Sequence, residues 1–304
     1  MKNNYIANID KQIKSAMLLA SIFGSLLLPS VANAFPVYAQ QAYENPREAT
    51  GRIVCANCHL AQKPTEIEVP QGVLPDTVFE AVVDIPYDLS VKQVTGDGTK
   101  GPLNVGAVVI LPEGFKLAPK ERLSEELKKA TEGVVISPYS DSKQNILVVG
   151  PISGNDHQRI VFPILAPNPA ENKDVHFIKY PIYVGANRGR GQVQPTGEKS
   201  NNTIYTSPVA GQIVKVESTD KVTVFTINSK SGDAVTVKVP VGPTILVKEG
   251  DTLNADQPLT IDPNVGGFGQ TETEVVLQSP GRVKGMIAFF FTIIQYSHFP
   301  IYFT

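Results

Sequence analysis

Five consecutive residues carry the plainest chemical signal in the sequence, namely Cys55-Ala56-Asn57-Cys58-His59. In a Cys-x-x-Cys-His motif the two thiols can add to the vinyl groups of haem, and the adjacent histidine can ligate the iron from the proximal side. The motif therefore predicts one haem c, covalently bound through Cys55 and Cys58, with His59 as an axial ligand. Covalent haem in turn predicts an exported, redox-active protein.

Three other kinds of protein could contain such a cysteine pair. A structural zinc site takes four ligands, and because the chain has only two cysteines, it would have to recruit His59, His157, His176 or carboxylates. A thioredoxin-like dithiol or a plain disulfide is a second reading, but the following histidine and the lack of a βαβ pattern argue against it. A structural β protein with an incidental cysteine pair is the third.

Length and charge limit the function further. With 304 residues and 42% hydrophobic content, the chain can bury a sizeable core and form two domains. Its net charge of −2 argues against nucleic acid as a partner.

The first residues have the pattern of an export signal. Lysines precede an apolar run at Ala16–Leu28, and Ala32-Asn33-Ala34 gives the small-x-small pattern that signal peptidase recognises. The run is shorter than the roughly 20 residues that a membrane span needs, so an uncleaved anchor is disfavoured. We predict a signal peptide at residues 1–34 and a mature chain that begins at Phe35.

Downstream of the signal, the pattern is mostly β. A helix is expected to start at Asn45-Pro46-Arg47-Glu48 and to run towards the cysteines. A second helix is expected at Pro119–Thr131, with Glu125 paired to Lys129. Alternating or apolar runs between Pro and Gly predict strands at Thr77–Ile85, Asn104–Leu111, Asn145–Val149, Arg159–Leu165 and His176–Val184.

A second β region follows Ser200. Tight turns there join further predicted strands at Gly211–Val216, Lys221–Ile227, Ala234–Val239 and Thr244–Val247, which indicates a small separate β-barrel. The stretch 248–259 is similar to barrels that carry lipoyl or biotinyl groups. No lysine has the hairpin context for that modification, so the likeness is one of architecture.

The last stretch is apolar. Met286–Thr304 contains no Lys, Arg, Asp or Glu, which suits a membrane span. Gln295, Ser297, His298 and Pro300 lie within it and no basic tail follows, so it is a weak anchor by the charge rule.

Several segments closely resemble the cytochrome f family. The likeness covers residues 35–284 and is carried by Phe35–Tyr43, Asn45–Ala61, Asn104–Ala107, Leu111–Phe115, Phe162–Pro167, Gly185–Gln192 and Pro263–Gly269. It implies a mainly β, elongated protein. A large haem-binding β-sandwich of fibronectin type III type would span 35–203, a small inserted β-barrel (barrel-sandwich hybrid) 204–264, a return to the large domain 265–284, and a transmembrane helix 285–304.

The resemblance also implies a function. Such a protein is an electron-carrier subunit of the photosynthetic cytochrome bf complex, beside the Rieske iron-sulfur protein and cytochrome b, and it is not an enzyme by itself. It would take electrons from the Rieske protein and pass them to plastocyanin or a soluble c-type cytochrome. It would sit in the thylakoid membrane with a single span and its haem domain in the lumen, in a plastid or a cyanobacterium. The family usually ends in a longer span with a lysine-rich tail, from which this chain departs.

The sixth iron ligand can be approached by elimination. The three methionines, the usual partners of a c-type histidine, lie in the predicted signal and anchor at Met1, Met17 and Met286. His157 and His176 remain, and cleavage would free the α-amine of Phe35, whose solution pKa of about 8 permits deprotonation at modest cost. The resemblance points to this amine as the axial partner of His59. A haem with an open sixth position, as in peroxidase-like or ligand-sensing cytochromes, is the alternative.

Two further groups of residues take their roles from the resemblance. Amides that suit a buried chain of waters, because each offers donors and an acceptor, are Gln93, Asn187, Gln192, Asn202 and Asn264. A modest positive area for docking an acidic acceptor would comprise Lys92, Lys100 and Lys221, diluted by Asp97 and Thr99.

Overall fold

The computed structural model describes residues 36–298. The predicted signal peptide, Phe35 and residues 299–304 lie outside this range, so the cleavage site and the last part of the predicted anchor are not described. Within it the chain is mainly β, as predicted.

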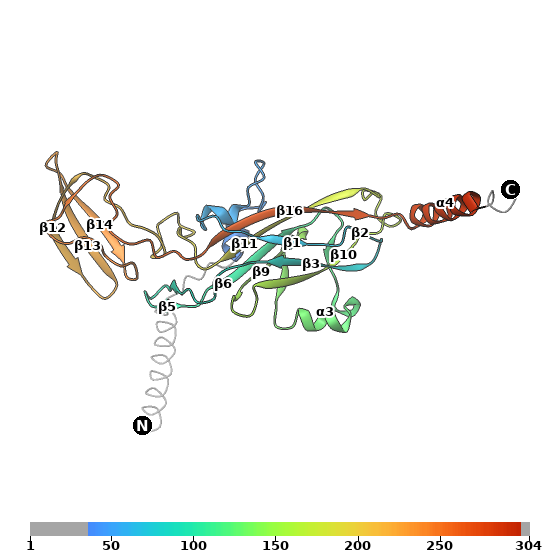
Figure 1. Cartoon of the computed structure of the whole chain (residues 1–304). Coiled ribbons are helices and arrows are strands. Elements are labelled where there is room, and N and C mark those ends of the chain that lie inside the picture. Colours follow the sequence, from blue (N-terminus) through green and yellow to red (C-terminus); the bar gives the residue numbers. More distant parts are fainter. Residues whose placement is uncertain (1–35, 299–304) are drawn as a thin grey trace, which may run out of the picture. The chain divides into compact units, whose positions relative to one another are not determined.

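Two sheets form the larger β region (Figure 1). Their strand orders are β2-β16-β11-β6-β9-β8 and β1-β3-β10-β7. The bounds are β1 Glu66–Glu68, β2 Gly72–Val73, β3 Val78–Asp84, β6 Asn104–Ile110, β7 Lys116–Leu117, β8 Ile136–Ser140, β9 Lys143–Ser153, β10 Arg159–Leu165, β11 Lys179–Arg188 and β16 Gly267–Leu277. The short pair β4 (Gln93–Val94) and β5 (Lys100–Gly101) stands apart from both sheets.

One apolar core joins the two sheets. Alternate residues of β3, such as Phe79 and Val83, are buried together with alternate residues of β11, such as Ile182 and Val184. Strand side chains point to opposite faces in turn, so each sheet contributes one face to this layer. The strand predicted at 77–85 is confirmed as β3, and the structure places Phe79, Ala81, Val83 and Ile85 in the core.

A third sheet has its own core. Its order is β14-β13-β12-β15, with bounds β12 Gly211–Ser218, β13 Val222–Ser229, β14 Ala234–Pro240 and β15 Thr252–Leu253. Apolar side chains including Ile213, Phe225 and Ile227 are packed inside it. The predicted strand at 244–247 does not form, since Ile245 makes only an isolated bridge to Thr260. After this sheet the chain returns to the six-stranded sheet as β16, beside β11.

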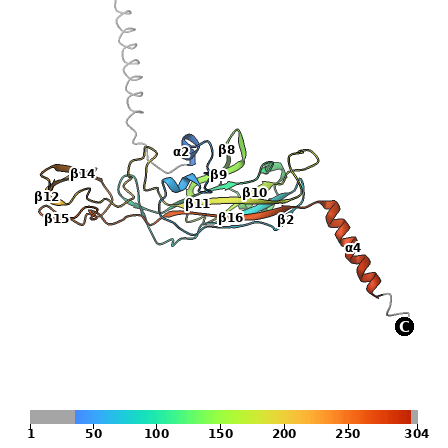
Figure 2. The same ribbon diagram turned by 90° about the horizontal axis from the view of Figure 1, so that it is seen from above.

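The helix predicted from Asn45 is wrong. Helix α2 lies earlier, at Pro36–Ala42 (Figure 2), and residues 45–53 form a tight reversal instead. The backbone N–H of Glu48 donates to the Arg52 carbonyl, and Gly51 has a φ of 87°. The residues from Asn45 to Glu48 match a helix start, but Gly51, three residues after Glu48, has a left-handed conformation that turns the chain back.

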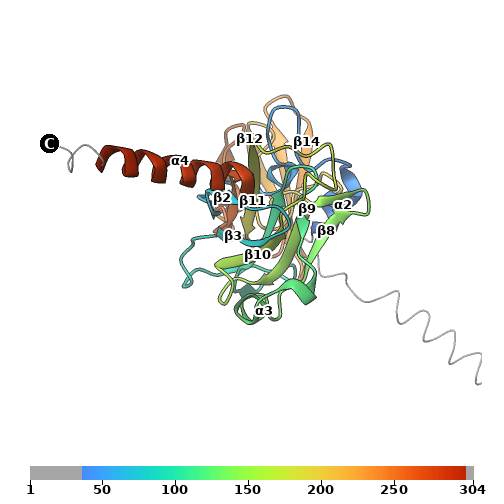
Figure 3. The ribbon, with the colours of Figure 1, turned by 90° about the vertical axis from the view of Figure 1, so that its right-hand side faces the viewer.

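The helix predicted at 119–131 is shorter and divided. A 3-10 turn, η2 (Lys120–Arg122), precedes α3 (Glu125–Ala130), which lies beside β10 (Figure 3). The Ser124 hydroxyl accepts from the backbone N–H of Leu127 and so caps α3. Lys128, not Lys129, pairs with Glu125, at 2.7 Å.

Helix α4 (Pro280–His298) follows β16. Its large apolar side chains, from Met286 to Tyr296, are exposed. Among the helices within residues 36–298, none combines the length and the hydropathy of a bilayer span. The transmembrane helix predicted for the C-terminus is therefore not confirmed.

Candidate haem-attachment site

One helical turn brings the motif together. The 3-10 turn η1 (Val54–Asn57) lets the backbone N–H groups of Cys58 and His59 donate to the Cys55 carbonyl at 3.2 and 3.0 Å. Both cysteines are free thiols. The two thiols and the imidazole therefore branch from a single turn of backbone, the arrangement that attachment to one flat ligand requires.

The electrostatics of the thiols disfavour the dithiol reading. Burial raises the pKa of the Cys55 thiol to about 12, and it also raises the pKa of Cys58. A thioredoxin-like nucleophile needs the opposite, a lowered cysteine pKa. The zinc reading lacks ligands too, since residues 36–298 contain no cluster of three His, Cys, Asp or Glu side chains able to hold a metal.

His59 has the protonation state that an iron ligand needs. Its side chain is buried, and burial lowers its pKa to about 4, so the imidazole is neutral near pH 7. Only a neutral ring nitrogen can donate its lone pair to a metal. Its Nδ1 is buried without a hydrogen-bond partner, and a ligating histidine normally has a partner at its second nitrogen.

Gln192 fixes the backbone on the C-terminal side of the motif. Its own N–H donates to the Cys58 carbonyl at 2.8 Å, and its Oε1 accepts from the Leu60 N–H at 2.8 Å. Because these bonds lie on both sides of His59, they restrict the position of the histidine backbone. A residue distant in sequence thus restricts the backbone of the predicted iron ligand, His59.

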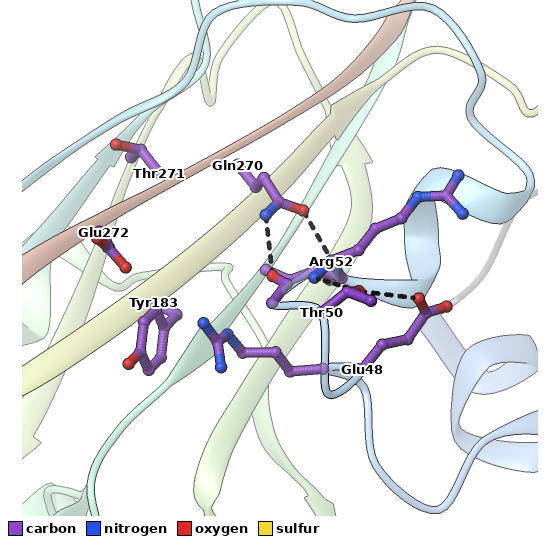
Figure 4. Close-up of a pocket in the computed structure, with 10 residues that line it drawn as sticks. Glu48, Thr50, Arg52, Tyr183, Gln270, Thr271 and Glu272 are labelled. Atoms are coloured by element: carbon purple, nitrogen blue, oxygen red, sulfur yellow. Dashed lines mark hydrogen bonds between the residues drawn. The ribbon is translucent and has the colours of Figure 1, made fainter.

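Gln270 fixes the backbone on the N-terminal side (Figure 4). Its Oε1 accepts from the Ile53 N–H at 2.9 Å, and its Nε2 donates to the Gly51 carbonyl at 3.0 Å. The Arg47 guanidinium lies 3.8 Å from the centroid of the Tyr183 ring, and both residues line an open pocket together with Gln270. These contacts hold the reversal at residues 45–53 against β11 and β16.

An apolar platform lies beneath the motif. Cys55 and Ala56 pack on a cluster contributed mainly by the six-stranded sheet, whose buried members are Ile53, Val108, Tyr139, Ile146, Val148 and Phe268. Val108 and Val148 alternate with Val109 and Val149, which face the sandwich core. The motif therefore rests on the outer face of the sheet.

Tyr139 ties helix α2 to this face. Its hydroxyl lies 2.7 Å from the carbonyls of both Ala39 and Tyr43, and the Gln40 amide donates to its carbonyl at 2.7 Å. The Tyr43 hydroxyl in turn accepts from the Asn57 amide at 3.1 Å. Helix α2 begins immediately after Phe35, so the chain that leads to the predicted amine ligand is fastened beside the motif.

Three of the five predicted amides, Gln93, Gln192 and Asn202, bond the backbone of Arg190, and a fourth, Asn264, contacts Asn202. The Arg190 N–H donates to Gln93 at 2.7 Å, and its carbonyl accepts from the amides of Gln192 and Asn202. Asn202 also reaches Asn264 at 3.4 Å, and its own Oδ1 is buried without a partner. Asn187 lies elsewhere on β11, near Gly106.

The three predicted docking lysines are exposed on neighbouring segments. The Asn201 amide donates to the carbonyls of both Thr95 and Val241, and the Val241 N–H donates to the Lys221 carbonyl. The turn at Lys221 therefore adjoins the β4–β5 hairpin, which contains Lys100 and follows Lys92 directly. Asp97 lies in the same hairpin.

The two histidines that are alternative candidates for the sixth iron ligand lie in loops. His157 follows β9, with its Nδ1 2.8 Å from the Ser153 carbonyl. His176 is exposed ahead of β11, where its backbone bonds the Tyr180 hydroxyl. Neither makes a hydrogen bond with the motif in the part of the chain that the structure describes.

Sequence reasoning missed Gln270, Tyr139 and Arg190. Gln270 and Tyr139 act through contacts with backbone groups far away in the chain, for example 217 positions for Gln270 and Ile53, whereas Arg190 acts through its own backbone, whose N–H donates to Gln93 97 positions earlier. No local pattern distinguishes such a residue from an ordinary polar strand residue. Taken together, the paired thiols, the neutral buried histidine and the apolar platform fit a covalently attached haem c.

Known proteins are similar in sequence to this chain along most of its length. The family model described as apocytochrome F, N-terminal, matches residues 35–189, and its C-terminal counterpart matches 201–299. A cytochrome f of Rhodomonas salina is 74% identical over 295 residues, covering 97% of this chain and 93% of that protein. A cytochrome f of Guillardia theta is 78% identical over 263 residues (86% and 82%), and one of Emiliania huxleyi 66% over 286 residues (94% and 92%).

Proposed function

The chain belongs to the cytochrome f family, and we propose that it carries single electrons through one haem c attached to Cys55 and Cys58, with His59 as an axial ligand. Members of this family are electron-transfer cytochromes with a c-type haem. One observation carries the residue assignment: His59 is buried and neutral on the same turn as two free thiols.

The haem supplies one-electron chemistry, and the residues around it supply position. Two covalent links and the Gln192 and Gln270 clamps restrict the movement of the motif between oxidation states. The apolar platform excludes water from one side of the site. A site whose structure changes little when an electron arrives has a low reorganisation energy, which suits an electron carrier.

Expression with a haem-attachment system tests the assignment directly. The full chain should yield a pyridine haemochrome spectrum of c type that stays with the polypeptide under denaturing conditions. The double variant Cys55→Ser/Cys58→Ser should lose covalent haem, whereas the matched exposed pair Ser140→Ala/Ser142→Ala should keep it. Haem retained covalently by the double cysteine variant would refute the assignment.

The free α-amine of Phe35 is the proposed second axial ligand. It is supported by the fastening of helix α2 through Tyr139 and by the lack of a methionine between Phe35 and Arg282. An Ala34 variant that blocks cleavage should change the low-spin haem spectrum, because the precursor has no free amine at this position. Unchanged ligation in a verified uncleaved precursor would return attention to His157, His176 or an open sixth position.

The proposed electron path runs from the Rieske protein of the cytochrome bf complex, which also contains cytochrome b, to plastocyanin or a soluble c-type cytochrome. Lys92, Lys100 and Lys221 would steer an acidic acceptor, and their neighbouring backbone segments support a shared surface. The rate of electron transfer to plastocyanin should fall as salt rises. A rate independent of salt would count against this surface.

The five amides, of which Gln93, Gln192 and Asn202 are buried, are proposed to line a chain of waters near His59. The unpartnered Oδ1 of Asn202 and Nδ1 of His59 are the polar atoms that such waters would satisfy. A high-resolution crystal structure should show ordered water within hydrogen-bonding distance of both atoms. Asn187 lies apart from the other amides, so the water that it binds should not contact the waters around Asn202.

Membrane attachment is proposed through residues 285–304, as a single span with the haem domain in the thylakoid lumen. The exposed apolar side chains of α4 support it. The proposed domain limits are 35–203, 204–264 and 265–284, and the separate core of the third sheet supports a small inserted domain. Carbonate washing should leave the intact chain in the membrane fraction, and quantitative release would reject an integral anchor.

A further inference from the structure

Arg188 is the largest side chain that the protein buries completely, with 0% of its surface exposed. It ends β11, opposite Gly267 of β16 and Val105 of β6. By strand alternation it shares the inward face of β11 with Val184 and Ala186. A guanidinium thus occupies the end of an otherwise apolar layer.

This charge has no counter-ion. Within residues 36–298 no carboxylate forms an ion pair with Arg188, and its Nε and Nη1 are buried without hydrogen-bond partners. Burial lowers its pKa to about 10, which still leaves it protonated at neutral pH. An unpaired buried charge is costly to the fold, and a role in function explains its presence.

The one bonded nitrogen reaches the segment that follows the haem motif. Nη2 donates to the Pro64 carbonyl at 2.5 Å and lies 3.2 Å from the Thr65 hydroxyl. Those residues come five and six positions after His59. The same segment is bonded to β16, because the Phe268 N–H donates to the Ala61 carbonyl and the Lys63 N–H donates to the Phe268 carbonyl.

Glycines bring these backbones close to Arg188. A Cβ on Gly266 would lie 2.1 Å from the Arg188 carbonyl oxygen, and one on Gly269 would lie 2.2 Å from the Lys63 carbonyl oxygen. Two residues beyond Arg188, the backbone of Arg190 holds Gln192, which clamps Cys58. Arg188 is therefore connected through both β11 and β16 to residues 54–65, the motif and the residues that follow it, which we call the haem segment.

We propose that Arg188 sets the reduction potential of the haem that this protein carries, by holding a positive charge in the interior behind the haem segment. This inference rests on the proposed function. An electron arriving at the iron lowers the positive charge of the site by one, so a nearby fixed cation favours the reduced state. Salt ions cannot approach a buried guanidinium closely, so its effect is screened less than that of a surface charge.

Substitutions that separate charge from shape test the proposal. In the full-length holoprotein, Arg188→Gln and Arg188→Met should lower the equilibrium constant for reduction by about tenfold, a potential about 59 mV more negative for one electron. Arg188→Lys keeps the charge and should stay closer to wild type than either. Lys63→Gln is the control, because it removes an exposed cation next to Pro64, which Arg188 contacts, and should shift the potential little.

The measurement is a redox titration followed by visible absorbance, with the low-spin spectrum as the check on ligation. The difference between Arg188→Lys and Arg188→Gln should persist as salt rises, whereas any effect of Lys63→Gln should shrink. If Arg188→Met does not accumulate as holoprotein, the Lys and Gln variants decide the question, since both retain hydrogen-bond donors.

A purely structural role gives a different result. Equal potentials for Arg188→Lys, Arg188→Gln and wild type, with unchanged spectra, would overturn the proposal and leave Arg188 as a tether of Pro64. A shift as large in Arg188→Lys as in Arg188→Gln would overturn it as well, because geometry and not charge would then be responsible. A wild-type chain without covalent haem would instead refute the proposed function.

Discussion

The side-chain oxygen of Gln192 accepts a hydrogen bond of 2.8 Å from the backbone N–H of Leu60, 132 positions earlier in the chain. Gln192 is 4% exposed, so water cannot replace this acceptor readily. The bond holds the residue that follows the predicted iron ligand.

Replacing Gln192 by leucine should therefore destabilise the fold. Leu60 N–H would lose its acceptor, and we expect a loss of about 1–3 kcal/mol in the free energy of unfolding. Urea unfolding followed by circular dichroism measures it. Gln144→Leu is the control, since that amide is exposed and its loss should change little. Equal stability of Gln192→Leu and wild type would show that the clamp contributes nothing.

Tyr139→Phe should loosen helix α2. The hydroxyl lies 2.7 Å from the carbonyls of Ala39 and Tyr43, and its removal should cost about 1 kcal/mol. Protection of the α2 amides against hydrogen exchange should fall more than that of β11. Exposed Tyr296→Phe should leave both unchanged.

The same tyrosine predicts a stability change at high pH. Burial raises the Tyr139 pKa from 10 to about 12. The unfolded chain then releases the proton first, so this group's contribution to stability declines as pH rises from about 10 to about 12. The decline should be smaller in Tyr139→Phe. An identical alkaline profile in both proteins would contradict the assigned environment.

His59 predicts a stability change at low pH in protein produced without haem attachment. Its pKa falls from 6.5 to about 4 on burial, so between those values the unfolded chain binds a proton that the folded chain does not. Stability contributed by the neutral ring is present above about pH 6.5 and is lost as pH falls to about 4. The full loss is about 3 kcal/mol.

Chemical unfolding at several pH values between 4 and 7 measures this effect. The His59→Asn variant controls for the carboxylates, which titrate in both proteins. The difference between the two curves should be largest at the acid end. Parallel curves would mean that His59 is accessible to solvent in the folded chain.

Gly269→Ala should be strongly unfavourable. The new methyl carbon would lie 2.2 Å from the Lys63 carbonyl oxygen and 2.4 Å from the Thr65 hydroxyl, so the segment after the motif would have to move away from β16. Overpacking of this kind typically costs about 1–3 kcal/mol. Gly285→Ala, with open space around it, should be neutral or slightly stabilising in α4. Melting temperatures of the two variants distinguish these outcomes.

Asp97→Asn should strengthen docking of an acidic acceptor. Hydrogen bonds from Thr95 and Thr99 lower the Asp97 pKa to about 2, so its negative charge persists beside the lysines at all working pH values. Removing that charge should raise the rate of association with plastocyanin at low salt and steepen its salt dependence. Lys116→Gln serves as the control for a charge change outside the hairpin. A slower rate in Asp97→Asn would argue that the hairpin's shape matters more than its charge.

Local sequence patterns were enough to predict the attachment chemistry and most of the strands. Cys55, Cys58 and His59 are adjacent, so their attachment chemistry can be recognised without knowledge of the fold. The alternation of Phe79, Ala81 and Val83 likewise predicts which face is buried, because strand periodicity is local. Local patterns failed where a single backbone angle decides, as at Gly51, whose left-handed conformation turns a predicted helix into a reversal.

The residues that hold the motif in place, and the buried charge of Arg188 near it, become visible only in the tertiary structure. Gln270, Tyr139 and Gln192 contact the haem segment or helix α2 from strands and loops that are about one hundred or more positions away in sequence. In the sequence, Arg188 is one of two arginines in a glycine-rich stretch, yet its side chain is completely buried and has no counter-ion among residues 36–298. Burial and long-range hydrogen bonds depend on how strands pair and layers stack, and no short window of sequence contains that information.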